Sequence, residues 1–289
     1  MSGRTIYHFE KPLVKAVLLQ RYKRFLADVS IPGAVTPTTV YCPNTGSMYG
    51  IIRSETSTQE CALSQSSRSG RKYEFTLEMI AIEGVWVGIH SSLANKMVKN
   101  AFEMGLIEEC AGYSGLSTEV KVADSRIDFE LVFGGPEDWE ANPSEGGPTK
   151  KRRKSGTSAG ARCPIGHRML VEVKSVTLAR QRDSVDGSES IAEFPDTVSD
   201  RASKHAETLT AHAEAGGRAA ILFLIQRGDA NSFTTSLLDP AYQRAVHRAE
   251  AAGVQILPYT CNLCPDSGRV VLGRRLPFLN PLAAPSPPP

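Results

Sequence analysis

The stretch 169–176 constrains the fold of this 289-residue chain more than any other feature. Its apolar residues alternate with two charged residues, Glu172 and Lys174. Such alternation predicts a strand with one buried face and places both charges on the opposite face. A second strand is predicted upstream at 126–132, and it carries Asp128. We therefore expect a sheet that brings an acid on one strand close to a Glu-x-Lys on another.

Three charged groups at one sheet are costly to desolvate unless they are paired or bind a metal. Asp128 and Glu172 offer the hard oxygen ligands that Mg²⁺ or Mn²⁺ prefers. Lys174 could orient a water or stabilise charge on a phosphate oxygen. The acid followed by Glu-x-Lys resembles the motif of the PD-(D/E)XK nuclease superfamily. The alternative is a solvated salt-bridge face, which the pattern taken alone favours.

Composition indicates an ordinary globular protein of one large or two smaller domains, with 41% hydrophobic and 22% charged residues. The net charge of +2 does not imply a polyanionic partner, so a nucleic-acid surface would have to be local. The six cysteines lack framework spacing, which favours a reducing compartment. The single C-x-x-C pair, Cys261 and Cys264, lacks the further ligands of a structural zinc site.

A soluble, cytoplasmic protein without a membrane segment is expected. The N-terminus lacks the apolar core of a secretory signal. The longest apolar run, 219–225, is far too short to cross a bilayer. The pure basic run 150–154 could contact nucleic acid or serve as a nuclear address, but a solvated loop is the plainer interpretation.

The first third of the chain is predicted to be a small OB-like barrel over residues 1–88. A long segment, 13–29, precedes short strand-like pieces that turn residues separate. These pieces are 40–42, 49–52, 73–80 and 85–89. Cations and aromatics interleave within the long segment, in a pattern that can pair phosphates and stack bases. The candidate nucleic-acid residues there are Arg21, Tyr22, Lys23 and Arg24. The alternative is a barrel strand whose outer face is only solvated, and the turn at 43–46 is expected to be a simple tight turn.

Residues 89–278 are predicted to form a mixed α/β domain, followed by a Pro-rich disordered tail at 279–289. Helices are expected at 93–104, begun by Ser91 or Ser92, at 199–215 and at 240–252. Strands are expected at 119–122, 126–133, 169–176, 218–226 and 254–259. This order resembles the α-β-β-β-α-β core of PD-(D/E)XK nucleases. Two segments, 134–167 and 180–193, are expected to be loose, the first as a flexible insertion.

Several stretches in one consistent order resemble the sugar fermentation stimulation protein family, known from bacteria as DNA-binding. They are 19–28, 42–48, 125–129, 172–178 and 194–205. The resemblance implies an OB-like domain followed by a nuclease-like domain. It implies a site made of Asp128, Glu172 and Lys174, with Glu119 as a fourth member.

One helix offers three further candidates for phosphate binding, namely Arg201, Lys204 and His205. The alternative, a solvated cationic face, is equally well supported. Asp196 is expected only to begin the turn into that helix. Three functions compete: a DNA-binding protein with a metal-binding, nuclease-like domain, an active Mg²⁺-dependent nuclease on DNA or RNA, and a non-catalytic interaction module. The first is favoured, because the resemblance implies DNA binding more firmly than cleavage.

Overall fold

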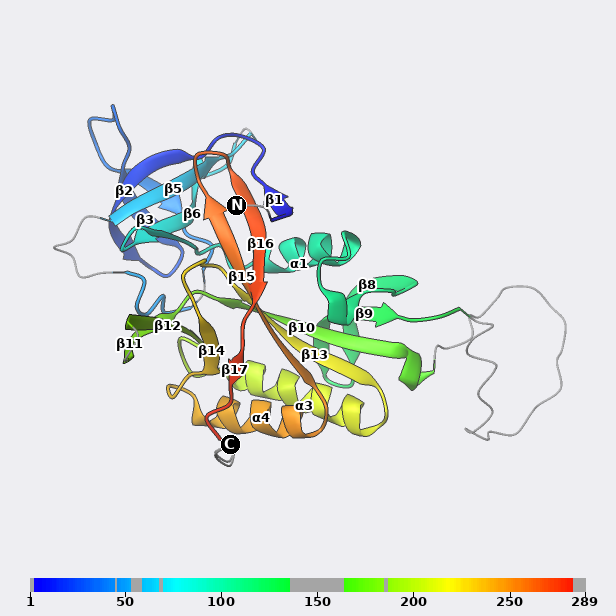
Figure 1. Cartoon of the computed structure of the whole chain (residues 1–289). Coiled ribbons are helices and arrows are strands. Elements are labelled where there is room, and N and C mark those ends of the chain that lie inside the picture. Colours follow the sequence, from blue (N-terminus) through cyan, green and yellow to red (C-terminus); the bar gives the residue numbers. More distant parts are fainter. Residues whose placement is uncertain are drawn as a thin grey trace, which may run out of the picture.

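The computed structural model is organised around three sheets (Figure 1). It describes residues 3–44, 46–52, 59–67, 70–135, 164–184 and 187–282. The basic run 150–154, most of the predicted insertion 134–167 and the last seven residues of the predicted tail 279–289 lie outside the described residues.

The first sheet is a closed barrel at the N-terminal end, drawn in blue to cyan in Figure 1. Its strands in spatial order are β4 (Thr38–Tyr41), β3 (Leu26–Ser30), β2 (Val14–Tyr22), β5 (Gln59–Gln65), β6 (Phe75–Ile82) and β7 (Val85–Gly88). Pairing of Tyr41 with Thr76 joins β4 to β6 and closes the barrel. Buried residues such as Val29, Leu63 and Leu77 fill its interior. The OB-like barrel expected from the sequence is confirmed.

One predicted barrel strand is wrong and another was missed. Residues 49–52 form a turn, and Ile51 is fully buried because the turn packs onto the barrel core. Gln59, at the start of the missed strand β5, donates to the backbone oxygen of Ile51 at 2.8 Å. The apolar residues of 49–52 therefore anchor a loop to the barrel core. A short apolar stretch in the sequence does not show whether it forms a strand or anchors a loop.

The second sheet has seven strands and is the centre of the larger domain. In spatial order they are β1 (Thr5–His8), β16 (Arg269–Arg275), β15 (Gln255–Cys264), β13 (Arg218–Ile225), β10 (Arg168–Val176), β9 (Ser125–Val132) and β8 (Gly115–Val122). β13 runs parallel to both of its neighbours, β10 and β15. Its apolar run is buried along nearly its whole length, as expected for a central parallel strand. The mixed sheet expected for this domain is confirmed.

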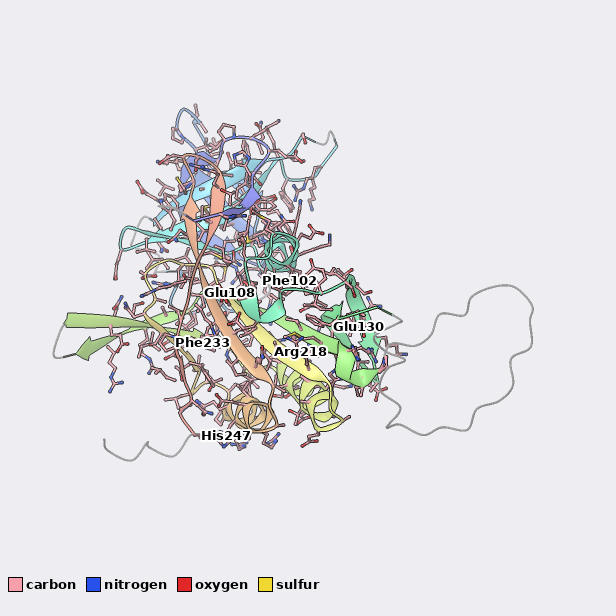
Figure 2. All side chains as sticks on the ribbon, turned by 45° about the vertical axis from the view of Figure 1, so that its right-hand side comes forward. Phe102, Glu108, Glu130, Arg218, Phe233 and His247 are labelled. Carbon is pink, nitrogen blue, oxygen red and sulfur yellow. The ribbon has the colours of Figure 1, made fainter. Side chains whose placement is uncertain are left out.

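Helices cover both faces of this sheet. α1 (Leu93–Glu103) shares a core with Val171 and Leu222 on one face. α3 (Asp200–Glu214) and α4 (Pro240–Ala251) share a core with Leu170 and Ile221 on the other face. Figure 2 shows Phe102 of α1 and His247 of α4 on opposite sides of the strands. Short 3-10 turns occur at η1 (Glu108–Cys110) and η2 (Ile165–His167).

The third sheet corrects the prediction that 180–193 is loose. Its strands are β11 (Ala179–Ser184), β12 (Gly187–Phe194), β14 (Ser232–Thr235) and β17 (Phe278–Leu279). β12 pairs with β14, which lies about forty residues downstream, so long-range pairing stabilises this segment. The N-terminal strand β1 likewise pairs with β16 of the large sheet. Residues 5–8 therefore belong to the second domain, although 1–88 was expected to be one barrel domain.

The helices beside the large sheet begin at different kinds of cap. The side chain of Ser199 accepts a hydrogen bond from Ala202 N at 3.2 Å at the start of α3. Asp239 accepts from Tyr242 N at 3.0 Å and from Ser199 N at 2.9 Å, so it joins the first turns of α4 and α3. Ser92 occupies the cap position of α1 without a side-chain cap bond, contrary to the prediction. Ser91 instead donates to Pro43 O at 3.2 Å, toward the barrel.

Replacing Asp239 with Ala is expected to lower the free energy of unfolding by about 2 kcal/mol, because two backbone N–H groups, one buried and one half-buried, lose their acceptor. Chemical denaturation monitored by circular dichroism measures this change. Asp239→Asn keeps one acceptor oxygen and should cost about half as much. An Asp239→Ala protein as stable as the parent would show that this residue does not join the two helices.

Candidate metal and nucleic-acid site

The site begins where the pairing between β9 and β10 stops. The antiparallel ladder ends at the pair Val171 and Phe129, although both strands continue. Beyond it, the side chain of Asp128 accepts from Val173 N at 2.8 Å, in place of a backbone partner. Its other oxygen accepts from Asn95 Nδ2 of α1 at 2.7 Å. A strand and a helix therefore fix the orientation of this carboxylate.

Glu172 lies on the face of β10 that is covered by α3, and it is only 3% exposed. Its Oε1 atom accepts from Lys174 Nζ at 2.7 Å and from His205 Nδ1. Its Oε2 atom is buried and has no hydrogen-bond donor among the described residues. Leaving a buried carboxylate oxygen without a donor is costly. This oxygen therefore calls for a further partner, such as a cation.

The pKa values of the two carboxyl groups are shifted in opposite directions. Burial, with a smaller contribution from the charge of Glu172, raises the pKa of Asp128. Burial alone would also raise the pKa of Glu172, but the contacts with His205 and Lys174 outweigh it and lower this pKa. Glu172 is thereby kept charged in an environment that would otherwise favour its neutral form.

These groups line a cavity of about 660 Å³ between the barrel and the larger domain. Asp128, Glu172 and Lys174 all lie on its wall, so the structure brings together the three residues predicted from separate strands. Asn44 and Gly46 of the barrel line the same cavity. Arg201 of α3 contributes an exposed cation to the wall. The cavity thus combines four acids, Glu119, Asp128, Glu172 and Asp196, with two cations and parts of both domains.

Glu119, the predicted fourth member, lies on the cavity wall but does not contact the other acids. Thr118 pairs with Phe129 and Val120 pairs with Ile127, so Glu119 on β8 lies opposite Asp128 on β9. Its side chain is 65% exposed and pairs with Arg126 at 3.1 Å. Its backbone φ of 52° is in the left-handed region, although it lies within β8. Glu119 is therefore a residue of the cavity rim.

The three candidates on α3 separate in the structure. His205 was expected on a phosphate-binding surface, but it is buried against Glu172. His205 lies four residues after Arg201 and was expected on the same helix face. At His205, however, the large sheet covers the helix. Lys204 is exposed and lines a different cavity with Asp124. Only Arg201 of the three lines the cavity with the acids.

The four barrel candidates also separate. Arg21 donates to the backbone oxygens of Asn44 at 2.9 Å and Gly46 at 3.0 Å, so it supports a loop. The hydroxyl of Tyr22 donates to Asp28 at 3.1 Å. The side chains of Lys23 and Arg24 are exposed at the tip of the β2–β3 turn, where both residues have left-handed φ angles of 49° and 61°. These two cations remain candidates for contacting nucleic acid.

Sequence reasoning missed three contributors to this site. Asn95 donates a hydrogen bond to Asp128. In the sequence, only its position early in the predicted helix could have pointed to this role. The segment 43–46 was interpreted as a simple turn, yet its described residues reach the cavity. Asp196 was expected only to begin a helix turn, but it accepts from Met48 N at 3.0 Å. Segment 43–46 and Asp196 lie in stretches that carry the family resemblance, and this resemblance was the only sequence feature that pointed to a role for them.

The donor set fits a hard divalent cation. Two carboxylates face one cavity, and one of their oxygens is buried without a donor among the described residues. The described part of the chain contains no group of three or more His, Cys, Asp or Glu residues that could hold a metal ion. Mg²⁺ typically binds one or two carboxylates and keeps several waters, so two protein ligands suit it.

No helix in the described ranges is both long and apolar enough to span a membrane.

Comparison with known proteins matches both domains. A model described as the SfsA N-terminal OB domain matches residues 19–89. A model described as the sugar fermentation stimulation protein RE domain matches residues 156–267. The structure of Pyrococcus furiosus SfsA in complex with Ca²⁺ superposes with a TM-score of 0.72 at 21% identity, covering 96% of this chain and 100% of that chain. This likeness confirms the fold.

Two curated relatives are similar over nearly their whole lengths. The sugar fermentation stimulation protein homolog of Thioalkalivibrio sulfidiphilus is 38% identical over 271 residues, which cover 93% of this chain and 96% of that protein. The homolog of Pelobacter propionicus is 36% identical over 270 residues, covering 93% of this chain and 98% of that protein. With both domain models matched and this similarity along almost the entire chain, the protein belongs to the sugar fermentation stimulation protein family.

Proposed function

We propose that this protein binds DNA and that its larger domain holds Mg²⁺ or Mn²⁺ between Asp128 and Glu172. The observation that carries the metal proposal is the buried Oε2 atom of Glu172, which lacks a donor within the described part of the chain. A cation bound beside both carboxylates would supply the missing partner. The Pyrococcus furiosus SfsA structure is a complex with Ca²⁺, another hard cation with oxygen ligands, and this supports the proposal.

The chain's own residues prepare the site. Asn95 and the backbone N–H of Val173 hold the Asp128 carboxylate in place. His205 and Lys174 keep Glu172 charged although it is buried. A bound cation would neutralise a phosphate and lower the pKa of a coordinated water. The positive charge of Lys174 lies on the same wall, where it can stabilise charge on a phosphate oxygen.

Cleavage of a phosphodiester is the second candidate function. The observation that favours it is the placement of Lys174 in one cavity with both acids, 2.7 Å from Glu172. This arrangement combines a metal site with a cation suited to a developing negative charge. Plasmid DNA, branched DNA and RNA, each incubated with Mg²⁺ or Mn²⁺, test it. If none of these is cut with either metal, the protein binds but does not cleave.

DNA binding is expected to involve the tip of the β2–β3 turn. The double variant Lys23→Asn/Arg24→Asn removes two exposed cations, and Asn tolerates the left-handed backbone at both positions. We expect DNA affinity to fall about tenfold and the slope of log affinity against log salt to decrease by about two. Fluorescence anisotropy over a salt series measures both quantities.

The matched control removes two positive charges elsewhere, in Lys99→Asn/Lys121→Asn. Lys121 is exposed on β8, and Lys99 pairs with Glu103 on α1 at 2.6 Å. Arg21 is left unchanged because it supports the loop that lines the cavity. If the turn variant and the control lose affinity equally, the barrel turn is not the contact surface. If the parent protein binds no DNA at low salt, the proposed DNA binding is wrong.

A further inference from the structure

The cavity is closed on one side by a loop from the other domain. We call residues 43–44 and 46–48 the barrel loop. Asn44 and Gly46 of this loop line the cavity that also contains Asp128 and Glu172. The barrel and the larger domain therefore build the cavity together, and the position of the barrel loop sets how much room is left beside the acids.

The barrel holds this loop rigidly from its own side. Arg21 donates to the backbone oxygens of Asn44 and Gly46 at 2.9 and 3.0 Å. The side chain of Asn44 is buried, donates to Ile89 O at 2.9 Å and accepts from Gly46 N at 2.8 Å. Both polar ends of Asn44 are thus occupied within the barrel.

Asp196 holds the loop from the larger domain. It lies between β12 and α3, and its Oδ2 atom accepts from Met48 N at 3.0 Å. Ser47 Oγ donates to the backbone oxygen of Asp196 at 3.0 Å. Gly46 lies so close that a Cβ atom there would approach Asp196 Oδ2 to 2.7 Å. Asp196 therefore clamps the barrel loop against the segment that also lines the cavity.

The rest of the wall suits one nucleotide. Phe194, Pro195 and Val198 provide apolar surface, and Val198 is 64% exposed. A base has an apolar face that packs on such side chains. Arg201 supplies a cation on the same wall, and a phosphate pairs with such a group. Apolar and cationic surface lie together beside the two acids.

We infer that this cavity accepts a nucleotide outside a duplex, in an unpaired strand, a flap or a strand end. The inference rests on the proposed function and names its substrate class. A volume of about 660 Å³ falls in the range of pockets that enclose one small ligand, about 300–1,000 Å³. In an intact duplex the partner strand accompanies each nucleotide, so a nucleotide reaches acids inside such a cavity only after leaving the stack.

The test compares DNA forms in the presence of Ca²⁺, using the whole protein and fluorescence anisotropy. The probes are a labelled single strand of about 12 nucleotides, a closed duplex of the same length whose two strands are chemically cross-linked at each terminal base pair, and the same duplex with an unpaired flap. We expect the single strand and the flap to bind at least about tenfold tighter than the closed duplex, which is about 1.4 kcal/mol. Equal affinity for all three would overturn the inference.

Two variants test the clamp from opposite sides. Asp196→Ala removes the acceptor, and Gly46→Ala pushes the loop away from Asp196. Each is expected to reduce the preference for unpaired DNA to less than about threefold, because a released loop opens the cavity to duplex. In the double variant, Gly46→Ala should add little, since its clash partner is gone. If both single variants keep the full preference, the clamp does not select the substrate and the inference fails.

The matched control also removes a contact between the domains. Asp266 pairs with Lys15 of β2 at 2.6 Å, and both side chains are exposed and outside the cavity wall. Asp266→Ala should leave the preference unchanged, and loss of preference in this variant would show that general loosening of the domains explains the effect. Loss of all DNA binding in the parent contradicts the proposed function. Salt-dependent DNA binding without a preference for unpaired strands contradicts only this inference.

Discussion

Glu172→Gln is expected to weaken Mn²⁺ binding at least about 100-fold. Gln has nearly the same shape and keeps one acceptor for Lys174 and His205, but it cannot carry the negative charge that a divalent cation requires. Isothermal titration calorimetry measures the affinity. Thermal unfolding gives a second readout, because a cation at about 100 times its Kd stabilises the folded protein by about 2.7 kcal/mol. This stabilisation should vanish in the variant.

The control for this variant is Glu130→Gln. Glu130 also lies on a central strand, pairs with Arg168 Nε at 2.6 Å and is mostly buried, but it does not line the cavity. Figure 2 labels it on β9, next to the edge strand β8 of the large sheet. This variant should keep Mn²⁺ binding while losing some stability. If Glu172→Gln binds Mn²⁺ as well as the parent does, the cation does not lie at Asp128 and Glu172.

On the proposal that the protein cleaves DNA, Lys174→Ala is expected to reduce Mg²⁺-dependent nicking of plasmid DNA by about 10²–10³-fold while Mn²⁺ affinity changes only a few-fold. Lys174 contacts Glu172 through one oxygen, and His205 still contacts that oxygen after the substitution. The carboxylate should therefore stay charged and ordered, while the cation proposed to face a phosphate is lost. Gel assays of nicked plasmid give the rate, and calorimetry gives the metal affinity.

Lys121→Ala is the control for the loss of one lysine, since Lys121 is exposed on β8 and does not line the cavity. It should nick DNA at the parent rate. Nicking that survives in Lys174→Ala at the parent rate would exclude a catalytic role for this lysine. Simultaneous loss of nicking and metal binding would instead show that Lys174 mainly maintains the charge of Glu172.

The difference between what the sequence predicts and what only the structure shows is clearest at Asp128 and Glu172. The alternation in 169–176 and the apolar run in 218–226 predicted two strands, and the structure pairs them in parallel. Asp128 and Glu172 were placed correctly on separate strands of one sheet. What the alternation did not show is that the ladder stops at Val171 and Phe129, which leaves the Asp128 carboxylate to accept from Val173 N. A carboxylate's hydrogen-bond partner depends on strand pairing, which has no local sequence pattern.

The partners of other charged residues were likewise not predictable from the local sequence. Arg21 and His205 resemble surface cations in the sequence, but one holds backbone oxygens of the barrel loop and the other is buried on Glu172. Asp196 looks like a turn residue, yet its partner Met48 is 148 residues away. The local sequence shows what kind of residue is present. Which partner that residue contacts depends on the distant segments that pack against it.

The sequence by itself predicted the two-domain order, the strands at 169–176 and 218–226, the helices at 199–215 and 240–252, and the candidate site residues Asp128, Glu172 and Lys174. These features depend on periodicity and on neighbours within a few residues. Only the tertiary structure decided that β1 joins the large sheet, that 179–194 forms strands, and that the barrel loop lies over the acids. Each of these depends on contacts between distant segments, whose free energy is gained only when the whole chain folds.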